Sequence, residues 1–68
     1  MKKHQLQALV AVAEHGSIRR AANALALSQT ALTKALRELE LDLQAGLLQR
    51  SPQGVRLTPI GLQLLQHA

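Results

Sequence analysis

The 68-residue sequence contains no cysteine and no phenylalanine, tyrosine or tryptophan. Without cysteine, the chain can form neither disulfides nor thiolate metal sites. Without aromatic residues, its core must be built from Leu, Val, Ile and Ala. A chain of this length is one domain or a part of one, and we expect its fold to be only marginally stable.

Long apolar runs are also missing, so no segment is expected to span a bilayer. Residues 1–16 begin like a signal peptide, with two lysines ahead of a short apolar run. However, Gln5, Gln7 and Glu14 interrupt this run at helical spacing. We therefore expect an amphipathic helix of the mature protein, no membrane partner and a cytoplasmic location.

Acidic residues are scarce: four Asp and Glu stand against eight Lys and Arg, which gives a formal net charge of +4. A basic chain favours a polyanionic partner. The same excess of charge is compatible with an ordinary solvated surface, so the positions of the charges matter more than their sum.

The spacing of apolar residues predicts a first helix over about residues 4–15, with Gly16 as its C-terminal stop. Its expected apolar stripe consists of Leu6, Leu9, Val10 and Ala13.

Two serines are placed to cap the next two helices. Ser17 precedes a short helix whose expected apolar positions are Ile18, Ala21, Ala22 and Leu25. The chain breaks near residues 26–27, and Ser28 precedes a third helix that is expected to run to about Leu43. The apolar face of this third helix consists of Leu32, Ala35, Leu36 and Leu39. Two short helices joined by a tight turn, the second with a polar outer face, are typical of a helix-turn-helix.

A hairpin and a fourth helix are expected after the third helix. Ser51-Pro52-Gln53-Gly54 has the residue choice of a type I turn, with short strands on either side. Thr58 then caps a helix that has Pro59 at its first position and runs to Ala68.

Cations gather where the helices begin. Arg19 and Arg20 open the second helix, and the third helix has its cations in its front half and its acids, Glu40 and Asp42, near its end. A helix prefers the reverse arrangement by about 0.3–1 kcal/mol for each charge. The placement therefore indicates selection for phosphate binding beside free N–H groups, with accidental surface charge as the alternative.

The outer face of the third helix has the chemistry that a DNA major groove requires. Lys34 and Arg37 can reach guanine edges or phosphates, and Gln29 can pair with adenine. Thr30 and Thr33 can meet thymine methyls with their own methyls or reach phosphates with their hydroxyls.

The hairpin adds a second candidate contact. Arg50 and Arg56 flank the turn and Gln53 is at its tip, which can lie near the minor groove; for Arg50, an ion pair with an acid of the third helix is a second interpretation. The candidate DNA-binding residues are Ser17, Arg19, Arg20, Ser28, Gln29, Thr30, Thr33, Lys34, Arg37, Arg50, Gln53 and Arg56.

The stretches LQALVAVAEHGSIRRAANALALSQTALTKALRELE, LLQR and GVRLTPIG resemble the N-terminal domain of LysR-type transcriptional regulators. The resemblance covers essentially the whole chain. It implies a mainly α, winged helix-turn-helix fold with a three-helix core, a small β-hairpin wing and a C-terminal linker helix. Residues 1–58 would form the DNA-binding domain, and residues 59–68 the start of the linker helix that pairs two subunits.

The same resemblance implies partners. These are double-stranded DNA with a roughly palindromic operator, a second copy of the chain, and a small-molecule inducer bound only by a C-terminal domain that this chain lacks. The full-length protein would be a tetramer, and no cofactor is expected. The candidate dimerisation residues are Leu62, Leu64 and Leu65.

The chain departs from the usual family pattern at a few positions. The family commonly has SQPALSR where this chain has SQTALTK. Gln44 stands where Gly usually ends the third helix, so either the helix ends differently or Gln44 adopts a left-handed conformation. Leu41 replaces a usual acid on the polar side, as an exposed leucine or a small contact site.

Other functions fit the sequence less well. An enzyme is not expected, because 68 residues cannot easily close a pocket around Ser28, His15 and Asp42. His4, His15 and His67 have no metal-ligand spacing. The alternatives that stay open are a winged-helix module that binds protein and the DNA-binding domain of a molybdate-responsive regulator.

Overall fold

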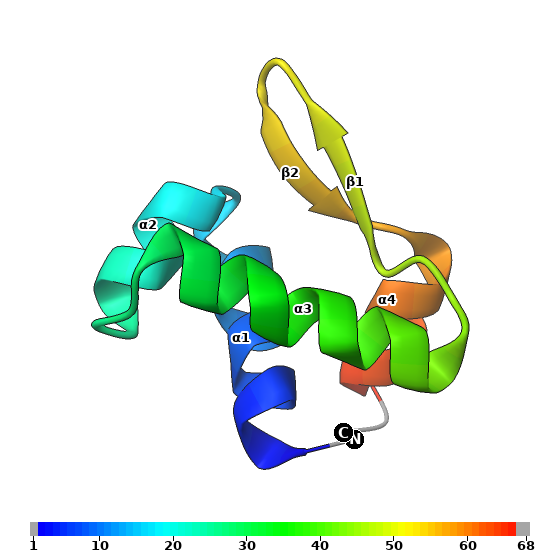
Figure 1. Ribbon diagram of the computed structural model, residues 1–68. Helices are drawn as coiled ribbons and strands as arrows, with labels where there is room; N and C mark the ends of the chain where they lie inside the picture. The colour runs from blue at the N-terminus through cyan, green and yellow to red at the C-terminus, as the bar shows by residue number, and fades with distance from the viewer. Residues whose placement is uncertain (1, 67–68) are drawn as a thin grey trace.

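Three helices, α1 (Lys3–His15), α2 (Ile18–Ala24) and α3 (Gln29–Leu43), form the body of the molecule in the computed structural model, which describes residues 2–66 (Figure 1). A two-stranded hairpin of β1 (Leu48–Ser51) and β2 (Gly54–Leu57) follows, and then the short helix α4 (Pro59–Gln66). The hairpin projects from the helical body on the side away from the start of α1 and the end of α4. This is the mainly α arrangement with a small wing that the sequence predicts.

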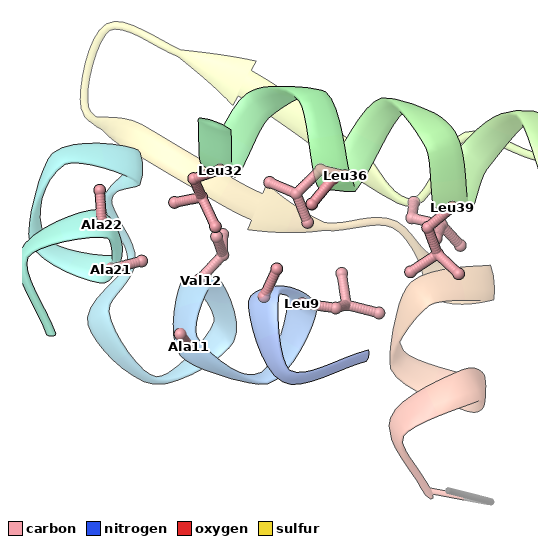
Figure 2. Close-up of a cluster of buried hydrophobic side chains, with 11 residues drawn as sticks. Leu9, Ala11, Val12, Ala21, Ala22, Leu32, Leu36 and Leu39 are labelled. Carbon is pink, nitrogen blue, oxygen red and sulfur yellow. The ribbon is translucent and has the colours of Figure 1, made fainter. Parts of the chain in front are cut away.

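The core lies between α1, α2 and α3, and Figure 2 shows its aliphatic side chains pointing toward one another. The predicted apolar face of α3 is confirmed, since all four of its residues are buried: Leu32, Ala35, Leu36 and Leu39. The small side chains of Ala21 and Ala22 are also buried, and they allow α2 to pack against its neighbours.

The predicted apolar stripe of α1 is only partly right: Leu9 is buried and Leu6 is half-buried. Val10 is 37% exposed and Ala13 is exposed, whereas the buried residues of α1 are Gln5, Ala8, Leu9, Ala11 and Val12. The side-chain amide of Gln5 can be buried because both of its ends are hydrogen-bonded. Its Oε1 accepts from the Lys2 backbone N–H at 3.1 Å, and its Nε2 donates to Glu38 Oε2 at 3.2 Å. A pattern that counts glutamine as a surface residue therefore selects the wrong face of this helix.

The predicted helix caps are confirmed. Gly16 ends α1 with a φ of 66°. Ser17 Oγ accepts from the Arg20 N–H at 3.3 Å, and Ser28 Oγ accepts from the Ala31 N–H at 3.0 Å. These side chains satisfy N–H groups that a helix start leaves without partners, so the chain begins α2 and α3 at the residues that the sequence indicates.

The hairpin is confirmed, and it is attached to the turn between α1 and α2. Its strands are antiparallel, with Ser51 opposite Gly54 at the turn. The Val55 N–H donates to the Gly16 carbonyl at 3.2 Å. A Cβ atom on Gly54 would lie 2.6 Å from the same carbonyl oxygen, so only glycine allows this close approach. The wing is therefore held beside the start of α2.

Helix α4 begins at Pro59, as predicted, and the Gly61 N–H donates to the capping hydroxyl of Thr58 at 3.2 Å. The last two residues of the predicted helix, His67 and Ala68, lie outside the described part of the chain.

Of the two alternatives for the end of α3, the structure has the left-handed conformation, since Gln44 has φ 52° and ψ 40°. Non-glycine residues adopt this conformation at a cost, because Cβ crowds the following carbonyl.

Gln44→Gly should therefore raise the free energy of unfolding by about 1 kcal/mol, which is about 4–8 °C in Tm for a domain of this size. Thermal unfolding followed by circular dichroism measures the change. Gln49→Gly is the matched control: Gln49 lies in β1, where glycine should destabilise instead. A Gln44→Gly protein that melts at or below the wild-type temperature would show that the conformation is not strained.

Candidate nucleic-acid interface

The outer face of α3 brings the predicted base-contacting residues together. Gln29, Thr30, Lys34 and Arg37 are exposed, and Thr33 is half-buried between them. They line a single hollow on the surface, together with Glu38 and Leu41. The face therefore presents hydroxyl, amide and cationic groups side by side.

Two acids of α3, Glu38 and Glu40, are hydrogen-bonded to other parts of the protein, which the helical pattern does not predict. Glu38 accepts the hydrogen bond from Gln5. Glu40 Oε2 accepts from the backbone N–H groups of Leu47 at 2.7 Å and Leu48 at 3.4 Å. Two carboxylates that would repel a polyanion are thus directed at α1 and at the chain leading into the wing. The position of Glu40 near the end of α3 has a structural reason, because it fixes the start of β1.

The start of α2 carries Arg19 and Arg20, and both side chains are exposed. Ser17 caps this helix with its hydroxyl, as described above, and is half-buried. Because the Gly16 carbonyl accepts from the Val55 N–H, the turn that leads into this helix lies against the wing.

The wing carries three exposed candidate residues, Arg50, Gln53 and Arg56. They line a hollow together with Gly16. Gln53 is in the turn, and Arg50 is paired with Val55 in the neighbouring strand. The structure therefore groups the wing residues with the turn that leads into α2, as a second basic surface next to the outer face of α3.

The three predicted dimerisation residues differ in exposure. Leu62 is 52% exposed, whereas Leu64 and Leu65 are half-buried and pack against the core. Ile60, which the sequence analysis did not single out, is 51% exposed on the same helix. The free apolar surface of α4 thus lies around Ile60 and Leu62.

Within residues 2–66, no three His, Asp or Glu side chains are grouped to hold a metal ion; His67 lies outside this range. In the same range, no helix combines the length and the apolar character needed to cross a membrane.

Residues 4–62 match the family described as bacterial regulatory helix-turn-helix proteins of the lysR family. The chain belongs to the LysR family. Among its relatives, the SDS degradation transcriptional activation protein of Pseudomonas sp. (strain ATCC 19151) is 48% identical over 64 residues, which are 94% of this chain and 21% of that protein. The LysR-type chain spans about a fifth of the length of the curated relatives that it matches.

Two solved structures of LysR DNA-binding domains bound to DNA have the same fold. The chain is 40% identical to the domain in the CbnR–DNA complex, with a TM-score of 0.93 over 98% of this chain and 77% of that one. It is 34% identical to the domain in the complex of BenM with catB site 1 DNA, with a TM-score of 0.93 over 98% of this chain and 75% of that one.

These similarities confirm the expected family, the winged helix-turn-helix fold and the class of function. The chain is a LysR-type helix-turn-helix DNA-binding domain and not an enzyme. The two alternatives, a protein-binding winged helix and a molybdate-responsive regulator, are not favoured.

Proposed function

We propose that α3 of this LysR-type domain lies in the major groove of double-stranded DNA, while the start of α2 and the wing bind phosphates on either side. The observation that carries the proposal is the composition of the outer face of α3. Apart from the exposed Leu41, its exposed groups are amide, hydroxyl and cationic. The carboxylates of Glu38 and Glu40 are bonded to other parts of the protein. A helix with such a face fits the width and the donor–acceptor pattern of the major groove.

Base contacts are assigned to the first half of α3. Lys34 and Arg37 would donate to guanine O6 and N7, and Gln29 would pair with adenine N6 and N7. The methyl groups of Thr30 and Thr33 would pack against thymine methyls, and Ser28 at the helix start would contact a phosphate. Since Lys34 stands where the family commonly has Arg, the preferred base at its position is expected to be specified less strictly.

Phosphate contacts are assigned to the basic residues around Gly16. Arg19 and Arg20 extend from the start of α2, where Ser17 and the helix N–H groups also favour an anion. Arg50 and Arg56 would contact the backbone from the wing, and the Gln53 tip would lie near the minor groove. These contacts would orient the domain without selecting a sequence.

The assembly that we propose is a pair of chains on a roughly palindromic site. Residues 1–58 would form the DNA-binding unit and residues 59–68 the start of the pairing helix, with Leu62, Leu64 and Leu65 along it. Exposed apolar surface at Leu62 supports this pairing. A full-length protein with a further domain would form a tetramer, and that domain would bind a small-molecule inducer. The protein would act in the cytoplasm, where bacterial DNA lies.

The experiment that tests the phosphate assignment is the salt dependence of Arg20→Ala. The loss of one phosphate contact should reduce the slope of log affinity against log salt by about 0.9, and should weaken selected and random duplexes alike. Fluorescence anisotropy at several salt concentrations, on a duplex selected from a random pool and on a random duplex, measures both quantities.

Lys3→Ala is the matched control, because it removes the same charge from α1, outside the proposed interface. It should leave the slope unchanged. Equal losses of slope in the two variants would mean that net charge, and not the start of α2, drives binding. An Arg20→Ala protein with an intact slope and a new sequence preference would contradict the phosphate role.

A further inference from the structure

Leu47 lies between α3, the proposed recognition helix, and the wing, and it connects α3 to α4. Its side chain is fully buried in the core. Its N–H donates to Glu40 of α3 at 2.7 Å, and its carbonyl accepts from the Thr58 N–H at 3.0 Å. One residue is thus bonded both to the recognition helix and to the residue that caps α4.

Gly61 brings the first turn of α4 against the same carbonyl. Gly61 is buried, and a Cβ atom there would lie 2.6 Å from the Leu47 carbonyl oxygen and 3.4 Å from Leu57 Cβ. The first of these distances is too short for any side chain, and the obstacle is backbone. Only glycine therefore allows α4 to pack in its present position.

The side chain of Thr58 completes the junction. Its hydroxyl donates to the Gly46 carbonyl at 2.7 Å and accepts from the Gly61 N–H at 3.2 Å. The wing begins and ends at this junction. Helix α4 is therefore joined to the end of α3 through Gly46 and Leu47, and not only through the wing strands.

We propose that Gly61 and Thr58 are positioning residues that determine which half-site spacing the protein accepts on DNA. The inference rests on the proposed function, in which α4 pairs two chains and α3 contacts DNA. The direction of α4 relative to α3 then sets the distance and the rotation between the two recognition helices of a pair. Half-site spacing on DNA changes in steps of one base pair, or about 3.4 Å, so a small displacement of α4 changes the preferred spacing.

The test uses the whole chain and a series of palindromes built from the half-site that the wild-type protein selects. The two half-sites are separated by spacers that increase one base pair at a time, and a duplex with a single half-site is measured alongside. The wild-type protein should have a narrow maximum, with an affinity at least about tenfold lower one base pair away. Gly61→Ala should move or flatten that maximum while leaving the affinity for the single half-site unchanged.

Two variants of Thr58 test the inference independently, in case the Gly61→Ala chain does not fold. Thr58→Val removes both side-chain hydrogen bonds and should broaden the accepted range of spacings. Thr58→Ser keeps the hydroxyl and should reproduce the wild-type profile. Thermal unfolding of each variant identifies the folded ones.

Wild-type spacing profiles in every folded variant at Gly61 and Thr58 would overturn the inference. So would equal losses on the palindrome and the single half-site, which would mean that the junction only supports the fold. If the wild-type chain binds one half-site as tightly as any palindrome, the two chains do not pair on DNA, and the inference is wrong. A wild-type chain that binds no selected DNA would instead contradict the proposed function itself.

Discussion

Alanine in place of Lys34 should lower the affinity for the selected DNA sequence by about 5- to 150-fold, the range expected for one good contact to a base edge. Lys34 is exposed in the middle of the outer face of α3. If its ammonium group donates to a guanine, its loss removes discrimination at that base pair. Affinity for random duplexes should fall much less, because a base contact contributes little to non-specific binding.

Competition binding against duplexes with each base pair changed in turn tests this expectation. Selectivity should relax at one or two adjacent positions and stay unchanged elsewhere. Lys3→Ala on α1 is again the control for the lost charge, and it should leave the whole preference profile unaltered. Equal losses of affinity for selected and random DNA would mean that Lys34 contacts a phosphate and not a base.

Leu32→Ala should have the largest effect on the fold. Leu32 is fully buried against α1 and α2, and truncation of such a leucine costs about 2–5 kcal/mol. The stability expected for a chain of this size is only about 3–10 kcal/mol. The Leu32→Ala protein should therefore lose about half of its free energy of unfolding and unfold at a much lower urea concentration than the wild type.

Leu41→Ala is the matched control, since it makes the same substitution on the same helix at a side chain that is 76% exposed. Its effect on the free energy of unfolding should stay within about 0.5 kcal/mol. Urea unfolding monitored by circular dichroism compares the two variants. Similar losses of stability would mean that α3 does not bury the face described for it.

The sequence predicted α3 and the helix caps correctly because the forces that decide them are local. The apolar period of α3 and the capping hydroxyls of Ser17 and Ser28 act within a few residues. The buried face of α1 could not be predicted in this way. Gln5 is buried because Glu38, 33 residues away, accepts from its amide, and no period within α1 contains that information.

As with the fold, only the part of the candidate site that depends on local pattern could be predicted from the sequence. The outer face of α3 follows from helical geometry once its core face is known. The relation of the wing and α4 to that face could not be inferred, because it depends on close approaches to distant backbone carbonyls. Gly54 lies against Gly16, and Gly61 lies against Leu47. The sequence contains both glycines, but the carbonyl groups that lie against them are known only from the folded structure.

The most direct test of the DNA interface is a titration of the isotope-labelled chain with a duplex that carries a single half-site, followed by the backbone amide NMR shifts. The large shifts should fall in three segments: the start of α2 around Arg19 and Arg20, α3 from Gln29 to Arg37, and the wing around Gln53. The exposed outer side of α1 around Val10 should shift little on binding. Large shifts confined to α1 and α4, with α3 unaffected, would contradict the claim that the outer face of α3 contacts DNA.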